Sequence, residues 1–198
     1  MPLILASSSP RRKELLGRLG IEFEVIPSFI DEVHHAGESP EDFALRVSSD
    51  KALHVAACLN GDYVVVGADT IVVINGEILG KPRDAEEAKS MLEKISGRDH
   101  RVITGFSIVK PKDQILHREY VESRVKIKTL APWEIEGYIK TLEPMDKAGA
   151  YGAQGIGAFM IEQIQGSYTN VVGLPLSQMV DVLTGLGILK LFSEDGNS

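Results

Sequence analysis

The sequence predicts one mixed α/β (α+β) domain, because segments with helical and with strand character alternate along its 198 residues. Residues 101–109 and 115–128 have the composition of two long strands, and apolar and charged side chains alternate in the second of them. Helical segments that begin near residues 9, 39 and 84 each start at a serine or an aspartate that can cap a helix. A mixed sheet flanked by helices fits this order of elements.

The first third of the chain contains two predicted strands and two predicted helices. The apolar run 3–6 is the first strand, and Ser9, which precedes a proline, begins a helix that ends at Gly20. Residues 23–26 form the second predicted strand. A second serine–proline pair begins a helix that we expect over residues 39–58.

The middle of the chain is expected to hold the most buried strand. Three consecutive valines at 64–66 favour a packed strand, because branched side chains suit a pleated, buried surface. Asn75-Gly76 predicts a tight hairpin turn between strands 71–74 and 77–79. A capped helix is predicted over residues 84–97.

The C-terminal part begins with a short helix at 132–141 and a glycine-rich loop at 148–157. Residues 158–164 are a candidate strand, and Leu174-Pro175 opens a final helix that we expect to end near Leu186. These elements complete the mixed architecture.

Composition restricts the class of protein. The length suits a single domain over residues 1–192 with a frayed tail at 193–198. No apolar run approaches the roughly 20 residues that cross a bilayer, and the N-terminus lacks the basic region of a signal peptide. We therefore expect a cytoplasmic protein without membrane contact. The net charge of −7 argues against binding to a nucleic-acid polymer, but not against a small anion held by local cations.

Asp69 lies where a buried strand meets a carboxylate, directly after Gly67 and Ala68. An unpaired buried carboxylate is costly, and the small residues before it leave room for a ligand. We therefore expect Asp69 to face a cleft at the end of its strand, close to a substrate or a metal. An aspartate that caps a turn explains the stretch equally well.

A second candidate site is the segment Ser7-Ser8-Ser9-Pro10-Arg11-Arg12. A strand leads into hydroxyl groups and then into a helix N-terminus, whose free N–H groups and dipole favour an anion. Arg11 and Arg12 add charge-assisted contacts to a phosphate. Helix capping explains Ser9 but not a serine triplet followed by paired arginines, so we favour a phosphate site that includes Ser7.

Further acids and lysines are candidates for the same site. Asp31-Glu32 follows a strand, and with Asp69 it offers oxygen ligands for Mg²⁺ or a general base for water. From their spacing alone, these two residues are more simply explained as loop acids. Lys51 lies on a helix, where a solvated lysine is the ordinary interpretation. Lys81, fixed beside Pro82 between a strand and a helix, is the better ligand candidate.

The glycine-rich loop holds one residue suited to reading a base. Glycines let the backbone approach a ligand, and the amide of Gln154 carries both a donor and an acceptor. Turn geometry alone explains the glycines but not Gln154 among them.

Several short motifs follow one another over nearly the whole chain. They are Leu5–Arg12, Asp31-Glu32, Lys51-Ala52, Gly67–Thr70, Gly80–Pro82, Asp146–Gly152 with Gln154-Gly155, and Val172–Pro175. In type and order they resemble the motifs of the Maf family of nucleoside triphosphate pyrophosphatases. Each motif is short, but chance does not explain the agreement of all of them.

The resemblance implies a reaction, a fold and an assembly. In that family, water cleaves the α–β phosphoanhydride of a nucleoside triphosphate with the help of a divalent cation, Mg²⁺ or Mn²⁺. The expected fold is ITPase-like, an elongated mixed β-sheet flanked by helices with a central nucleotide cleft. A homodimer is also expected.

The resemblance also implies roles in catalysis. The position of Asp69 is that of the family's proposed proton acceptor, and Glu32 and Asp69 are the expected metal ligands. Arg11, Lys51 and Lys81 are expected to neutralise phosphate charge next to the helix start.

The substrate follows from the loop Tyr151-Gly152-Ala153-Gln154-Gly155, which resembles the branch that acts on dTTP and UTP. Positions matching Arg11, Thr70 and Gln154 are tied to substrate choice in the family. We therefore expect a dTTP/UTP pyrophosphatase. The alternatives are the same chemistry on 7-methyl-GTP or another modified nucleotide, and a nucleotide-binding regulator of septum formation or cell division.

Overall fold

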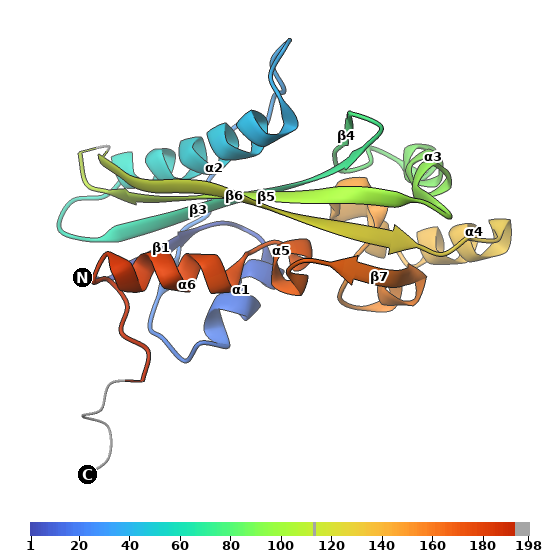
Figure 1. The fold of residues 1–198 in the computed structure, drawn as a ribbon. Helices are drawn as coiled ribbons and strands as arrows, with labels where there is room; N and C mark the ends of the chain where they lie inside the picture. Colours follow the sequence, from blue (N-terminus) through green and yellow to red (C-terminus); the bar gives the residue numbers. More distant parts are fainter. Residues whose placement is uncertain (113, 193–198) are drawn as a thin grey trace.

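A computed structural model describes residues 1–112 and 114–192 and shows a seven-stranded mixed sheet with helices against it (Figure 1). The strand order is β2-β1-β3-β5-β6-β7, and β4 pairs with β3. β1 is parallel to β2 and to β3, whereas the other neighbours are antiparallel. The predicted mixed class is confirmed. The expected frayed tail, 193–198, lies outside the described residues.

The three longest strands, β3, β5 and β6, are neighbours in the sheet. The strands are β1 (Leu3–Ala6), β2 (Glu24–Val25), β3 (Val64–Ile74), β4 (Glu77–Leu79), β5 (Asp99–Lys110), β6 (Gln114–Ile127) and β7 (Ile161–Gln165). The helices are α1 (Pro10–Gly17), α2 (Pro40–Ala57), α3 (Ala85–Ile95), α4 (Pro132–Lys140), α5 (Tyr168–Val172) and α6 (Leu176–Gly185).

Local sequence signals start α2, α3 and the hairpin as predicted. The Ser39 side chain accepts a hydrogen bond from the Asp42 amide at the start of α2, and Asp84 accepts one from Glu87 at the start of α3. Asn75, at the turn between β3 and β4, has a φ of 51°, and Gly76 beside it has a φ of 80°. Two successive positive φ angles are what the predicted hairpin turn requires.

The C-terminal third differs from the sequence-based expectation in two elements. The expected strand at 158–164 begins only at Ile161, because Ile156–Met160 forms a short 3₁₀ helix. The helix α5 was not predicted, since its five residues are too few to show a helical period. Its cap is Ser167, whose side chain accepts a hydrogen bond from the Asn170 amide.

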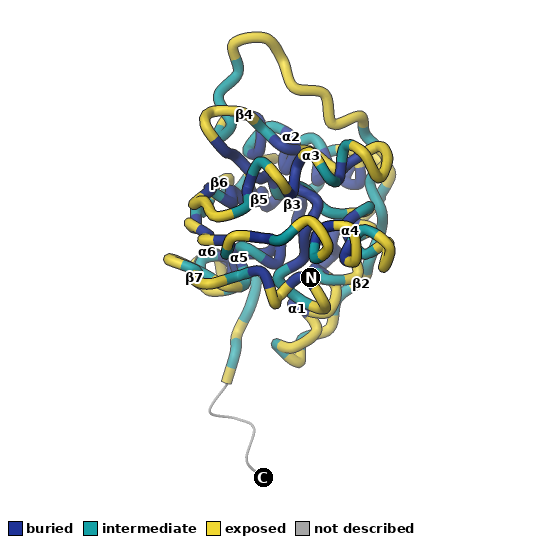
Figure 2. The backbone as a smooth tube through the Cα atoms, turned by 90° about the vertical axis from the view of Figure 1, so that its right-hand side faces the viewer, coloured by how far each residue is buried: buried dark blue, intermediate teal, exposed yellow. Residues whose placement is uncertain are grey.

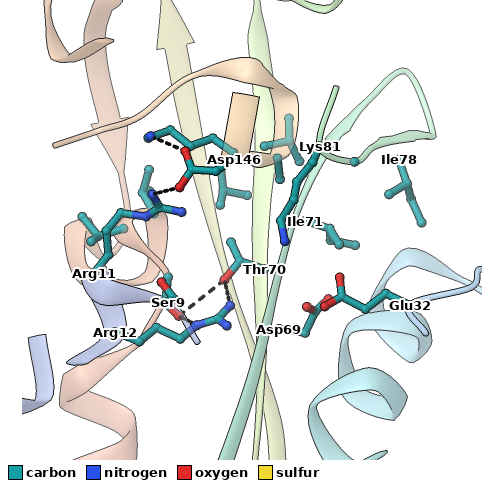
Figure 3. Close-up of a pocket in the computed structure, with 18 of the residues that line it drawn as sticks. Ser9, Arg11, Arg12, Glu32, Asp69, Thr70, Ile71, Ile78, Lys81 and Asp146 are labelled. Atoms are coloured by element: carbon teal, nitrogen blue, oxygen red, sulfur yellow. Dashed lines mark hydrogen bonds and ion pairs between the residues drawn. The ribbon is translucent and has the colours of Figure 1, made fainter. Parts of the chain in front are cut away.

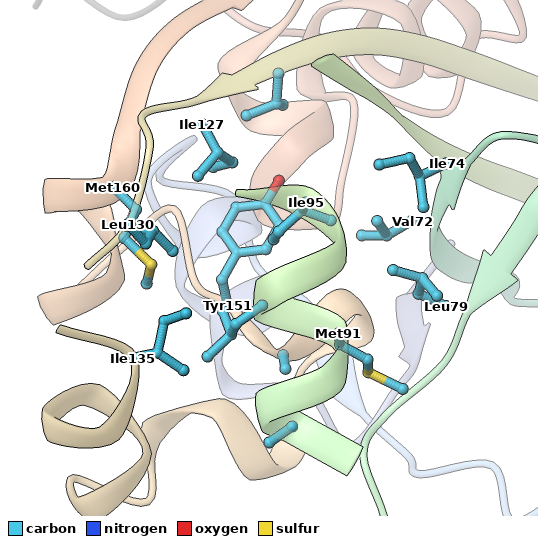
Figure 4. Packing of buried hydrophobic residues seen from close by; sticks show 14 of the residues in the cluster. Val72, Ile74, Leu79, Met91, Ile95, Ile127, Leu130, Ile135, Tyr151 and Met160 are labelled. Carbon is cyan, nitrogen blue, oxygen red and sulfur yellow. The ribbon is translucent and has the colours of Figure 1, made fainter. Parts of the chain in front are cut away.

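Helices cover both faces of the sheet, α2 on one and α1, α5 and α6 on the other (Figure 1). Successive residues of β3 point to opposite faces, as the strand period requires. Val65 packs with α2, whereas Val64 and Val66 pack with α1 and α6. A third core at the far end joins β3 to α3 and α4 around Tyr151 and Ile95 (Figure 4). Figure 2 shows the buried segments at the centre of the fold and the exposed ones in the outer loops.

Two glycines let α2 lie unusually close to the sheet. A Cβ atom on Gly67 of β3 would overlap the carbonyl oxygen of Ser48 and come within 2.8 Å of the amide nitrogen of Ala52. On β5, a Cβ at Gly105 would overlap the backbone of Ala44. Because neither residue has a side chain, α2 can pack close to β3 and β5. This short distance also sets the position of Lys51 on α2.

One edge of β3 is open in the middle of the strand. β1 pairs with it as far as Gly67, and β4 pairs with it only from Val72 onward. Within the described part of the chain, residues 68–71 have no strand partner on that edge. The expectation that Asp69 ends its strand was therefore wrong. Asp69 lies in mid-strand, because β5 pairs continuously along the other edge of β3, and the gap between β1 and β4 opens the sheet there.

None of the helices in the described residues has the length and apolar character that crossing a bilayer requires.

Candidate active site

A cleft of about 840 Å³ opens at this gap in the sheet edge (Figure 3). Its walls come from the loop between β1 and α1, the stretch of β3 with the open edge, the loop after β4, and the segment after α4. The volume lies within the range of a small-molecule ligand site. Of the nine predicted site residues, eight line this cleft: Ser7, Arg11, Arg12, Glu32, Lys51, Asp69, Thr70 and Lys81.

Asp69, Lys51 and Glu32 form a compact ionic triad. The Lys51 Nζ atom lies 2.7 Å from Asp69 Oδ1 and 2.6 Å from Glu32 Oε1. Asp69 is only 4% exposed and Lys51 only 7%, so each would be costly to bury alone. The pairing of two carboxylates with one ammonium explains how the charges are tolerated and leaves the triad with a net negative charge. Lys51 is thus not the solvated lysine that its helix suggested.

A clamp on α2 holds the loop that carries Glu32. The Arg46 guanidinium donates to both carboxylate oxygens of Glu38, at 2.6 and 2.9 Å, and to the backbone oxygen of Val33 at 2.8 Å. This contact lowers the pKa of Glu38 to about 2. Because Val33 directly follows Glu32, the clamp fixes the acid against α2. Sequence reasoning missed Arg46, since its partners lie in an irregular loop.

Arg12 connects three segments of the cleft wall through hydrogen bonds. Its Nε donates to the carbonyl oxygen of Gly173 at 2.8 Å, Nη2 donates to Thr70 Oγ1 at 3.0 Å, and Nη1 donates to Ser7 Oγ at 3.3 Å. Burial lowers the pKa of Arg12, and the neighbouring charge of Asp69 acts in the opposite direction. These contacts join α1 to the segment after α5 and use most of the donors that a phosphate would need.

Thr70 is part of the same hydrogen-bond network. Its Oγ1 lies 2.9 Å from Thr104 Oγ1, and Thr104 in turn donates to the carbonyl oxygen of Asn170 at 3.0 Å. Thr70 therefore fixes the position of Arg12 and the chain around Asn170, in addition to lining the cleft.

The start of α1 faces the cleft as an anion site would. Ser9 occupies the N-cap position, but its side chain makes no capping hydrogen bond. Ser7 Oγ instead accepts a hydrogen bond from the Ser9 amide at 3.1 Å. The first turn of this eight-residue helix thus keeps free N–H groups for a ligand, with Arg11 beside them.

Of the predicted residues Lys81 and Gln154, only Lys81 lines the cleft. Lys81 is exposed and points into the cleft from the loop after β4, towards Asp69 (Figure 3). Gln154 is not among the residues that line the cleft. Its loop is held from behind by Glu143, whose carboxylate accepts hydrogen bonds from the amides of Ile156 and Gly157 at 2.9 and 3.0 Å.

A buried pair lies next to this loop, and of the two residues only Tyr151 lines the cleft. The Tyr151 hydroxyl lies 2.7 Å from His100 Nε2, and both residues are buried. Burial lowers the pKa of His100 to about 4, despite the opposing charge of Asp99, and burial raises the pKa of Tyr151. Both side chains are therefore neutral at pH 7, so Tyr151 adds no charge to the lining of the cleft, in contrast to Arg11 and Arg12 at α1.

Known proteins have sequences similar to this one over nearly its whole length. The profile of the family described as Maf-like protein matches residues 2–186. A dTTP/UTP pyrophosphatase of Syntrophus aciditrophicus is 51% identical over 193 residues, which are 98% of this chain and 93% of that protein. Proteins of the same name from Clostridioides difficile and Geobacter metallireducens are 47% and 52% identical, over 97% and 94% of this chain and 98% and 97% of theirs.

The fold is shared with a more distant protein of known structure. A HAM1 protein from Coxiella burnetii superimposes with a TM-score of 0.51 at 15% identity, over 94% of this chain and 96% of that one. At this identity the likeness concerns the fold alone, and it confirms the predicted ITPase-like architecture.

Proposed function

The chain belongs to the Maf family, and from this premise we propose that it hydrolyses the α–β phosphoanhydride of dTTP and UTP to the nucleoside monophosphate and pyrophosphate. The observation that carries the proposal is the Asp69–Lys51–Glu32 triad, which lies in the same cleft as the free N-terminus of α1. An ionised carboxylate next to an anion site is what the activation of water beside a phosphate requires.

The charged site residues predicted from the sequence have distinct roles in this proposal. Asp69 accepts a proton from the attacking water, and Lys51 holds the carboxylate in place. Arg11 and Lys81 neutralise phosphate charge together with the amides of α1. Arg12 acts through its contacts with Ser7 and Thr70, which fix the phosphate-binding loop.

The same carboxylates suit a divalent cation. Glu32 and Asp69 converge on one ammonium nitrogen, and oxygen ligands of this kind are preferred by Mg²⁺ and Mn²⁺. No group of three or more metal-binding side chains occurs among the described residues, so substrate and water oxygens would complete the shell, as is usual for Mg²⁺. A cation held there would stabilise negative charge on the phosphates.

The choice of dTTP and UTP rests on the relatives that carry this name and on the loop around Gln154. A panel of nucleoside triphosphates with Mg²⁺ or Mn²⁺ tests it through kcat/KM. We expect UTP and dTTP to exceed ATP, GTP and 7-methyl-GTP by about tenfold or more, since a site built around one base rejects others.

The Gln154→Ala variant belongs in the same panel, with Gln178→Ala as the control outside the cleft. A reduced preference for UTP in the first variant alone supports the role of Gln154. A wild-type ranking led by 7-methyl-GTP or a purine nucleotide would overturn the substrate assignment. The proposal of a homodimer rests on the family resemblance, and that of a cytoplasmic location rests on the composition of the sequence.

A further inference from the structure

A carboxylate bridges two cations that line the cleft. Asp146 Oδ2 lies 3.2 Å from Arg11 Nη1, and Asp146 Oδ1 lies 2.7 Å from Lys147 Nζ (Figure 3). Arg11 belongs to α1, whereas Asp146 ends the short 3₁₀ helix Glu143–Asp146. The bridge therefore connects two segments that line the cleft and lie far apart in the sequence.

Lys147 is seated in the cleft by a glycine. The lysine side chain is 12% exposed, and its Nζ also donates to the carbonyl oxygen of Glu143 at 2.7 Å. A Cβ atom on Gly152 would come within 2.7 Å of Lys147 Cε, so the glycine makes room for the lysine stem. This contact gives a physical reason for Gly152 in the loop and directs a cation into the cleft.

Asp146 is the displaceable member of the bridge. Its side chain is 62% exposed, against 24% for Arg11 and 12% for Lys147. Partial burial opposes the effect, but Lys147 and Arg11 together hold the pKa of Asp146 below its usual value, so the carboxylate is ionised at neutral pH. A rotation towards solvent would release both cations without moving the backbone.

Two of the other cations of the cleft are already engaged, and a third, Lys81, enters from the loop after β4. Lys51 is matched by two carboxylates, and Arg12 is engaged by neutral oxygens of the protein. Within the described residues, Arg11 and Lys147 share one charged partner, the exposed Asp146. Two cations that converge on a carboxylate are also arranged to converge on a phosphate.

We propose that Lys147 is a further phosphate-binding residue, and that Asp146 occupies the Arg11–Lys147 pair in the empty cleft and leaves it when the pyrophosphate portion of the substrate binds. This inference rests on the proposed function and extends it. Asp146 then weakens ligand binding by competition, whereas Lys147 strengthens it.

The test is the binding of inorganic pyrophosphate, with Mg²⁺ at fixed concentration, measured by isothermal titration calorimetry. Asp146→Asn keeps a side chain of the same shape and removes the competing charge, so the Kd should fall about two- to fivefold, the range of an exposed ion pair. Lys147→Met keeps the aliphatic stem and should raise the Kd about tenfold. Lys147→Arg should restore most of the affinity.

The matched controls are Asp181→Asn and Lys140→Met, two exposed positions outside the cleft, which should leave the Kd unchanged. Thermal unfolding of each variant separates a loss of binding from a loss of fold. Weaker or unchanged binding by Asp146→Asn would show that the carboxylate only ties the walls together. Unchanged binding by Lys147→Met, or no binding by the wild type, would equally overturn the inference.

Turnover of UTP by the wild type distinguishes this inference from the proposed function. If UTP is not cleaved but the pyrophosphate affinities change as expected, the proposed function fails and the phosphate site stands. If UTP is cleaved and the affinities do not change, the enzyme assignment stands and the role of Lys147 fails.

Discussion

Replacing Asp69 by Asn is expected to lower kcat for UTP by about a thousandfold, within the usual range for the loss of a general base. Asparagine has nearly the same shape and still accepts a hydrogen bond from Lys51, which also keeps its contact with Glu32. It cannot accept a proton from water, and it is a poorer ligand for a divalent cation. The variant should therefore fold and bind nucleotide while it loses turnover.

The measurement is the rate of pyrophosphate release under saturating UTP, with circular dichroism and thermal unfolding as tests of the fold. Asp62→Asn is the matched control, because Asp62 is an exposed acid that does not line the cleft. Turnover close to that of the wild type in Asp69→Asn would remove this residue from the mechanism.

Replacing Gly67 by Ala should destabilise the fold by about 3 kcal/mol, the upper part of the range for overpacking a core. The added methyl group would overlap the Ser48 carbonyl and crowd the Ala52 amide, both of which belong to the backbone of α2. The helix must then move away from β3. Because Lys51 lies on this helix and contacts Asp69 on this strand, kcat should fall as well.

Urea unfolding measures the change in the free energy of unfolding. Gly137→Ala is the control, since this glycine lies in α4 and no neighbouring atom lies within 4 Å of where its Cβ would be. Alanine there should stabilise the protein by up to about 1 kcal/mol through its better helix propensity. Similar stability for both variants would contradict the close approach of α2 to the sheet.

Local signals in the sequence predicted the elements that begin at caps and turns. Ser39, Asp84 and Asn75-Gly76 act on neighbours within three residues, so their effect can be deduced without the fold. The open edge of β3 could not be deduced in this way. It depends on where β1 ends and where β4 begins along β3. One of these strands precedes β3 in the sequence and the other follows it.

The site shows the same division between local and long-range effects. The residues around Asp69 and around Ser7 indicated two separate candidate sites, and the fold places both in one cleft. The pairing of Lys51 with Asp69 depends on the glycine contacts that bring α2 close to the sheet. Asp146 belonged to a recognised motif without a role, because its partner Arg11 is 135 residues away in the chain.

Analysis of the products from UTP shows directly whether the cleft breaks the bond between the α- and β-phosphates. The wild type is incubated with UTP and a divalent cation, and the products are resolved by ³¹P NMR. We expect UMP and pyrophosphate in equal amounts from the start of the reaction. Formation of UDP and inorganic phosphate, or intact UTP after prolonged incubation of folded protein, would contradict it.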